Sequence, residues 1–172
     1  MLKRPSHEDY PEYYRGYVGL VPEGDFVSII EEQQKVMKDL ISSISDIQAN
    51  HRYAPGKWSL KEVFGHIIDT ERIMSYRLLR FARGDQTPLA GFNENFFVEN
   101  AGFDKLSMTD LLEEYMSVRQ STLALVRGLP EESWVRKGIA NEKVTSTTAL
   151  AYIIAGHELH HLNIMKERYL GQ

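Results

Sequence analysis

The chain has 172 residues, of which 42% are hydrophobic and 26% are charged, and its formal net charge at pH 7 is -4. This length suits one domain with a proper core, and the composition is ordinary for a globular protein without the broad basic surface that nucleic-acid binding needs. The sequence has no cysteine, which excludes disulfides, thiolate metal sites and a cysteine nucleophile.

The sequence also lacks the signals of a membrane or exported protein. No apolar run approaches the ~20 residues of a membrane-spanning helix, and the opening stretch MLKRPSHEDY has no signal-peptide core. We therefore expect a cytoplasmic protein whose partner is a small molecule, with no nucleic acid and no membrane. Any metal would be bound by His, Asp or Glu, and any thiol would be brought in by the substrate.

The first half of the chain divides into an arm and two helices. Residues 1–24 are rich in Pro, Gly and Tyr and predict an irregular arm, whose tyrosines either pack along the body or reach the rim of a pocket or a dimer partner. From Asp25 onward, apolar residues at helical spacing predict a first long helix that ends before a loop at 50–57. The pattern Ser59 to Glu62 is a capping box and starts a second helix, which runs to about Arg83 with His66 on its inward stripe.

The second half supplies two more helices. Residues 84–107 form a long crossover with a short helical turn inside it, and a third helix follows from about Thr109 to Gly128. A turn at 129–134 and a polar loop at 136–144 lead into a last helix from about Ser146 to Gly171. We predict an all-α fold, a four-helix bundle with a long crossover between helices two and three. Residues 1–172 would form one domain, with the arm at 1–24 and the bundle at 25–172.

Three histidines stand out as metal ligands. His157 and His161 lie four residues apart on the apolar face of the last helix, and His66 is the inward histidine of the second. Facing helices can bring such a set together in a bundle core, where neutral imidazoles would bind one divalent metal and leave a position open for water or substrate. Zinc or nickel is expected ahead of iron. His7 and His51 lie in arm and loop and are treated as ordinary residues.

Other polar residues flank this set. Asp69, Glu62 and His160 are candidates to hold an imidazole N–H, with His160 lying to one side of the stripe. Arg77 and Arg168 lie on inward stripes some turns away. They predict either salt bridges at the bundle end or a clamp for an anionic substrate.

The run from His157 to His161 also matches the H-E-x-x-H pattern of zinc metalloproteases, in which the Glu is the general base. The downstream ligand or glycine turn of those enzymes is missing from the remaining residues. We therefore disfavour a protease.

Three stretches carry a family resemblance: GKWSLKEVFGHIIDTERIMSYRLLRFARGD at 56–85, the GFNENFFV that follows, and AGHELHHLNIMKERYL near the end. Together with the arm YPEYYRGYVGLVPEGD, they resemble the DinB/YfiT-like superfamily of small bacterial metal-binding bundles. The resemblance implies a four-helix bundle, commonly a homodimer, with one His on the second helix and His-x-x-x-His on the fourth. That pattern falls on His66, His157 and His161.

What the resemblance implies about activity is less specific. Some relatives transfer low-molecular-weight thiols such as bacillithiol or mycothiol, some isomerise thiol adducts, and others are described as metal-dependent hydrolases. We expect a metal-dependent enzyme that uses such a thiol as cosubstrate and transfers it to an electrophile. The alternatives are a hydrolase with a metal-activated water and a non-catalytic metal-binding stress-response protein.

Overall fold

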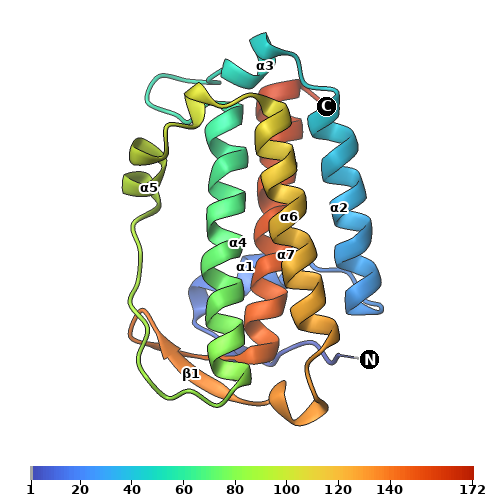
Figure 1. Cartoon of the computed structure of the whole chain (residues 1–172), viewed down its shortest axis with the longest axis vertical. Helices are drawn as coiled ribbons and strands as arrows, with labels where there is room; N and C mark the ends of the chain where they lie inside the picture. Colours follow the sequence, from blue (N-terminus) through green and yellow to red (C-terminus); the bar gives the residue numbers. More distant parts are fainter. Residues whose placement is uncertain (1) are drawn as a thin grey trace.

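Four long helices form an elongated bundle in the computed structural model, which describes residues 2–172 (Figure 1). The bundle helices are α2 (Phe26–Ser42), α4 (Leu60–Ala82), α6 (Met108–Arg127) and α7 (Thr147–Ile164). Helix α4 packs against α6 and α7, and α2 packs against the same two helices. The predicted four-helix bundle is thus confirmed.

Local capping sets where these helices begin. The Ser59 hydroxyl accepts a hydrogen bond from the Glu62 backbone N–H, and the Glu62 carboxylate accepts one from the Ser59 N–H at 2.7 Å. Ser107 and Asp110 form the same reciprocal pair at the start of α6. Both boxes satisfy backbone N–H groups that have no partner within the helix.

The crossover leaves α4 and carries the short helix α5 (Glu94–Ala101) before it reaches α6. Helix α5 stands beside α4 at the edge of the molecule (Figure 1). The 3-10 turn that follows α5 (Phe103–Lys105) also packs on α4, and Gly65 makes this contact close, because a Cβ there would lie 2.5 Å from the ring of Phe103. A helical turn inside the crossover was expected, and α5 is two turns long.

The first bundle helix is shorter than predicted. It ends at Ser42, and a separate helix α3 (Asp46–Asn50) follows. Ser45 starts α3 through a capping box with Gln48, so the chain changes direction where the apolar spacing alone would continue the helix. Ile47, the last residue at the apolar helical spacing that predicts the first helix, is 86% exposed.

The arm is more regular than predicted. It contains two short 3-10 turns (His7–Asp9 and Glu12–Tyr14) and the helix α1 (Arg15–Leu20), which packs against α7. The contact depends on Gly156, because a Cβ at this position would lie 2.0 Å from the backbone oxygen of Tyr17. A glycine in the middle of α7 thus permits two backbones to meet.

The polar loop predicted at 136–144 is instead a β-hairpin of β1 (Lys137–Ala140) and β2 (Lys143–Ser146), paired antiparallel. Its two turn residues, Asn141 and Glu142, have φ values of 49° and 62°, as in a two-residue hairpin turn. The hairpin lies at the lower end of the bundle in Figure 1, where Leu89 of the crossover bridges to Ala140. The turn at 129–134 contains a 3-10 segment (Glu131–Ser133).

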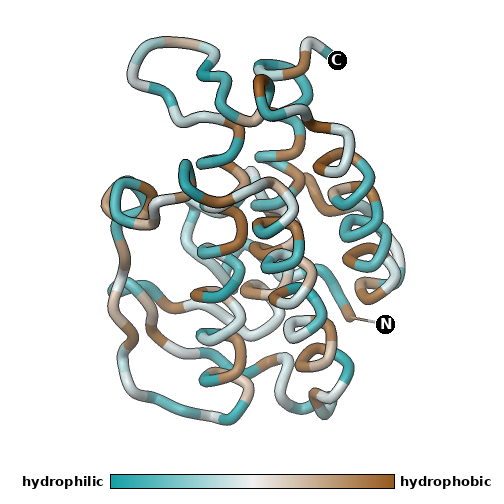
Figure 2. Tube along the Cα trace, turned by 45° about the horizontal axis from the view of Figure 1, so that its top comes forward, coloured by the Kyte–Doolittle hydropathy of each residue, from teal (hydrophilic) through white to brown (hydrophobic). Residues whose placement is uncertain are grey.

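Helix α7 is the central element. Hydrophobic and hydrophilic positions alternate along the bundle helices (Figure 2). In α7, by contrast, nearly every residue between Thr147 and Glu158 is buried. It continues as a π-helical turn (Met165–Leu170) that ends at Gly171 in a left-handed conformation. Within residues 2–172, no helix is long and apolar enough to cross a membrane.

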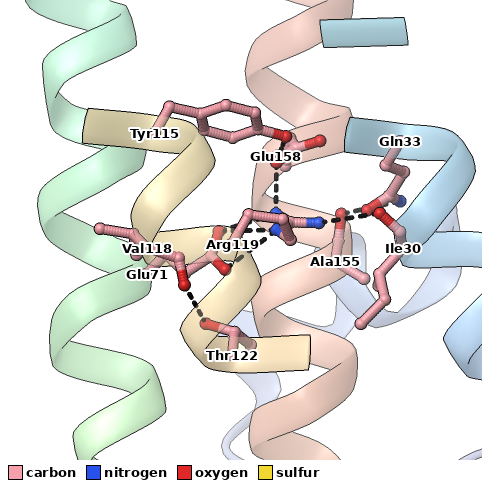
Figure 3. Close-up of polar contacts among 9 residues, drawn as sticks. All are labelled: Ile30, Gln33, Glu71, Tyr115, Val118, Arg119, Thr122, Ala155 and Glu158. Carbon is pink, nitrogen blue, oxygen red and sulfur yellow. Dashed lines mark hydrogen bonds and ion pairs between the residues drawn. The ribbon is translucent and has the colours of Figure 1, made fainter. Parts of the chain in front are cut away.

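A buried ion cluster joins the four bundle helices (Figure 3). The guanidinium of Arg119, which is fully buried, donates to both carboxylate oxygens of Glu71 at 2.7 to 3.1 Å and to Glu158. The Tyr115 hydroxyl donates to Glu158 at 3.0 Å, and Arg119 also donates to the Ile30 carbonyl. Burial opposes the charge of Arg119, but its two carboxylates outweigh this and raise its pKa.

Candidate metal centre

Three imidazoles meet between α4 and α7. His66 comes from α4, and His157 and His161 come from adjacent turns of α7, so the four-residue spacing places both on the side that faces α4. The Nε2 atoms of His66 and His157 are 3.0 Å apart. One nitrogen from each of the three rings lies within 4.8 Å of those from the other two. The structure therefore brings together the three ligands that the sequence predicts.

Their surroundings keep these rings neutral. Burial lowers the pKa of His66 to about 4 and that of His161 to about 3, and it lowers the pKa of His157 well below its usual value. Neighbouring histidines also disfavour the protonation of His157 and His161. Neutral imidazole is the form that binds a metal.

A divalent metal fits this donor set. Metal–nitrogen bonds of ~2.0 to 2.1 Å in a tetrahedral site place the nitrogens about 3.3 Å apart, which falls within the separations found here. His161 supports the fit, because its Nδ1 is buried without a hydrogen-bond partner among the described residues. A bound cation would give such a nitrogen a partner, and zinc, nickel and iron all accept imidazole.

Neighbouring side chains fix the ring orientations. The Thr70 hydroxyl lies 3.5 Å from Nδ1 of His66, one helical turn away, so the opposite ring nitrogen is left for a ligand. The Trp58 ring lies 4.9 Å from the His66 ring. The Tyr17 ring lies 5.4 Å from that of His157, edge to face. Helix α1 thereby covers the centre from the arm side.

The centre opens into a cavity of about 510 Å³, a size typical of small-molecule sites. The cavity walls come from the arm, α4, the crossover, the hairpin and α7. Sequence reasoning missed Trp58, Glu94 and Lys143 among the lining residues, and it left open where the arm residues Tyr14 and Tyr17 lie. The tyrosine cluster of the arm was a usable signal, but the sequence could not decide between packing along the body and lining a pocket.

The three residues proposed to hold an imidazole N–H are placed differently. The Glu62 carboxylate caps α4 and pairs with Arg52. Asp69 is half-buried, and the charged groups that act on it are Glu114 and Arg72. Neither carboxylate is thus directed at the histidines.

His160 does lie beside the centre. Its ring is 4.9 Å from that of His161 and 5.2 Å from that of Tyr17, and it is half-buried. This neighbouring position agrees with its predicted place to one side of the ligand stripe.

The two arginines proposed to bind an anionic substrate differ in their position relative to the cavity. Arg77 is 4% exposed and lines the cavity. Arg168 is exposed and donates to the Tyr53 hydroxyl at 3.2 Å, away from the cavity walls. Only Arg77 can reach a molecule bound in the cavity.

Glu158, the Glu of the H-E-x-x-H pattern, points away from the histidines. It is 1% exposed and is engaged by Arg119 and Tyr115 in the ion cluster. Burial raises its pKa to about 7. A metalloprotease-like general base is therefore excluded at this position.

A family model for the DinB superfamily matches residues 29–165, which is most of the chain. The chain belongs to the DinB superfamily. This confirms the resemblance inferred from the sequence, and the matched region of this DinB-superfamily chain includes all three histidines. Among curated proteins, none matches the chain significantly.

Solved structures share the fold. YfiT from Bacillus subtilis, described as a probable metal-dependent hydrolase with an unusual four-helix bundle topology, superposes with a TM-score of 0.70 at 19% identity over 85% of this chain and 86% of that one. The DinB-like protein YjoA from the same organism gives 0.61 at 20% identity, over 87% and 93% of the two chains. A mycothiol-dependent maleylpyruvate isomerase gives 0.67 at 11% identity, over 84% of this chain and 61% of that one. At these identities the likeness concerns the fold alone.

Proposed function

We propose that this DinB-superfamily chain is a metal-dependent enzyme that transfers a low-molecular-weight thiol to an electrophilic small molecule. The observation that carries the proposal is a set of three neutral imidazoles in the wall of a cavity large enough for a small substrate. A non-catalytic metal-binding module would have no need of such a cavity beside its ligands. Zinc and nickel are the first metals to test.

Thiol chemistry fits the composition. The chain has no cysteine, so a thiol would come from a cosubstrate of the bacillithiol or mycothiol kind. One structural neighbour is named as a mycothiol-dependent enzyme, which supports the same choice. When bound by His66, His157 and His161, a divalent metal would lower the pKa of a coordinated thiol and favour its thiolate form.

The chain's own residues would prepare the substrates. Glu94, at the first turn of α5, is the one carboxylate among the cavity-lining residues and acts electrostatically on His66. We assign its carboxylate as the acceptor of the thiol proton. Tyr17 and Trp58 pack on the histidine rings and exclude water, which strengthens electrostatic interactions inside the site.

Hydrolysis is the second candidate, because YfiT is described as a probable metal-dependent hydrolase. The same three histidines would serve it, with a metal-activated water in place of the thiol. The two reactions differ in their need for an added thiol.

The test compares zinc- and nickel-loaded protein with the His157→Ala variant, each incubated with a panel of low-molecular-weight thiols and monochlorobimane. We expect metal-dependent conjugate formation above background with at least one thiol, and background rates in the variant. Absence of conjugation with every thiol would contradict thiol transfer. Thiol-independent cleavage of an ester or amide substrate by the same preparation would then favour the hydrolase.

A further inference from the structure

Arg77 is a buried cation without a counter-ion among residues 2–172. Its Nη2 donates to the Ala90 carbonyl at 2.8 Å, its Nη1 lies 3.6 Å from Sδ of Met74, and the Tyr14 side chain acts on it electrostatically. None of the ion pairs within residues 2–172 includes it. Arg119, which is also buried, is paired with two carboxylates.

Such an arrangement is costly for folding, because a charge removed from water loses its hydration and here gains only neutral partners. The part of Arg77 that is not bound to protein faces the cavity that the histidines also line. An anion entering this cavity would therefore meet a guanidinium that is already desolvated and held in place. Charge-assisted hydrogen bonds to a guanidinium are among the stronger ones.

The other charged residues of the cavity wall are also arranged in favour of an anion near Arg77. Lys143, from the hairpin strand β2, is a second cation among the lining residues. The single lining carboxylate, Glu94, acts on His66 and on Tyr17 and is not among the groups that act on Arg77. The cavity thus has a metal-binding end and a cationic end.

The two ends lie on one face of α4. His66 and Arg77 are separated by about three helical turns, or roughly 16 Å along the axis. Side chains of a helix all lean toward its N-terminus, and the longer Arg77 leans further than His66, so the two functional groups lie on the order of 10 to 16 Å apart. A molecule that touches both ends must therefore be elongated.

We propose that the Arg77 end of the cavity binds an anionic oxygen group of the substrate, such as a carboxylate, while the reactive end of the same molecule lies at the three histidines. The substrate class is thus an elongated organic acid. The part that concerns the reactive end rests on the proposed function. The anion subsite depends on Arg77 and does not depend on the proposed function.

The test measures binding of chain-length-matched probes to the zinc-loaded protein by calorimetry. The probes are mercaptopropionate, mercaptohexanoate and mercaptoundecanoate, each compared with the mercaptoalcohol of the same length. Because the thiol is common to each pair, the ratio of affinities isolates the acid group. We expect a preference for the acid of about ten-fold or more at one of the longer lengths and none for mercaptopropionate.

Variants locate the effect. Arg77→Gln should abolish the preference for the acid while leaving the affinity for the alcohol within about two-fold, and Lys143→Gln should reduce it. The matched control is Arg168→Gln, the same substitution outside the cavity, which should leave the ratio unchanged. A preference that survives Arg77→Gln would overturn the proposal.

Two further outcomes also test the proposal, namely a variant that does not fold and thiol probes that do not bind. If Arg77→Gln does not fold, equal binding of acids and alcohols by the wild-type protein at every length would overturn the proposal, and a length-dependent preference would support it. If neither kind of thiol binds, thiol use is contradicted. The same comparison between octanoate and octanol then tests the anion subsite separately.

Discussion

At the scale of single residues, the histidines of the candidate centre are stabilised in the neutral form. Their pKa values are lowered from the 6.5 expected in the unfolded chain. The pKa falls to about 4 for His66 and to about 3 for His161. Between these values and 6.5, the unfolded state binds more protons than the folded state. Folding stability must therefore fall as the pH falls through this window.

We predict that the metal-free protein is markedly less stable at about pH 4.5 than at about pH 7, with His66 alone accounting for about 3 kcal/mol at the acid limit. The measurement is urea unfolding of metal-free protein across this range. Replacement of His66 by Asn, which does not titrate, should reduce the pH dependence by the His66 share and leave that of His157 and His161. A pH dependence unchanged in this variant would contradict the assignment.

The ion cluster gives a second prediction at this scale. Arg119→Met should destabilise the protein by about 3 to 5 kcal/mol, because Glu71 and Glu158 would be left buried without their cation. Glu158→Gln should cost much less, since burial already raises the pKa of this carboxyl to about 7 and Arg119 keeps Glu71. Unfolding free energies from denaturant titrations compare the two.

The Glu158→Gln variant also tests whether Glu158 takes part in chemistry at the histidines. Because its side chain points away from the histidines, Glu158→Gln should retain metal binding and any metal-dependent activity. A loss of activity with intact folding would restore the metalloprotease-like interpretation of the H-E-x-x-H pattern.

At the scale of elements, the arm is fixed to the bundle at one glycine. Gly156→Ala places a methyl group where the Tyr17 backbone oxygen lies, so α1 must move away from α7. We predict a destabilisation of about 1 to 3 kcal/mol together with exposure of the histidines, because Tyr17 would leave His157. Faster modification of histidine by diethylpyrocarbonate in the metal-free variant would report the exposure. Gly16→Ala, where a Cβ meets nothing, is the control.

The elements that could be predicted are those encoded locally. Helical spacing of apolar residues and the capping box at Ser59 identify the bundle helices, and the box at Ser45 could have marked the break after α2. The hairpin could not be predicted in this way, because its strands are short and Gly138 is required by the close approach of Phe81 from α4. Such a contact between distant segments leaves no local pattern.

In the candidate site, too, some residues could be predicted from local spacing and others depend on contacts between distant segments. His157 and His161 share one helix, so their spacing alone predicts that they converge. The choice between Arg77 and Arg168 depends instead on where the crossover and the arm cover the bundle, and the helical stripe treats the two alike. Tyr17 and Glu94 reach the cavity from segments far away in the sequence.

At the scale of the whole molecule, the fold is a bundle whose central helix contributes to two clusters on different sides. One side of α7 contributes His157 and His161 to the cavity, and the other contributes Glu158 to the ion cluster that joins the four helices (Figure 3). The cluster fixes the position of α7, and the arm, the crossover and the hairpin enclose the space beside it. The account of function therefore depends on whether the three histidines bind a metal together.

Metal content after saturation with zinc and extensive dialysis tests this claim most directly. We predict about one zinc ion per chain for the wild-type protein and for the control His51→Ala, whose side chain is exposed outside the cavity. His66→Ala, His157→Ala and His161→Ala should each lose most of the bound metal while remaining helical. Full metal content in the triple variant, or none in the wild-type protein with any of zinc, nickel and iron, would contradict the account.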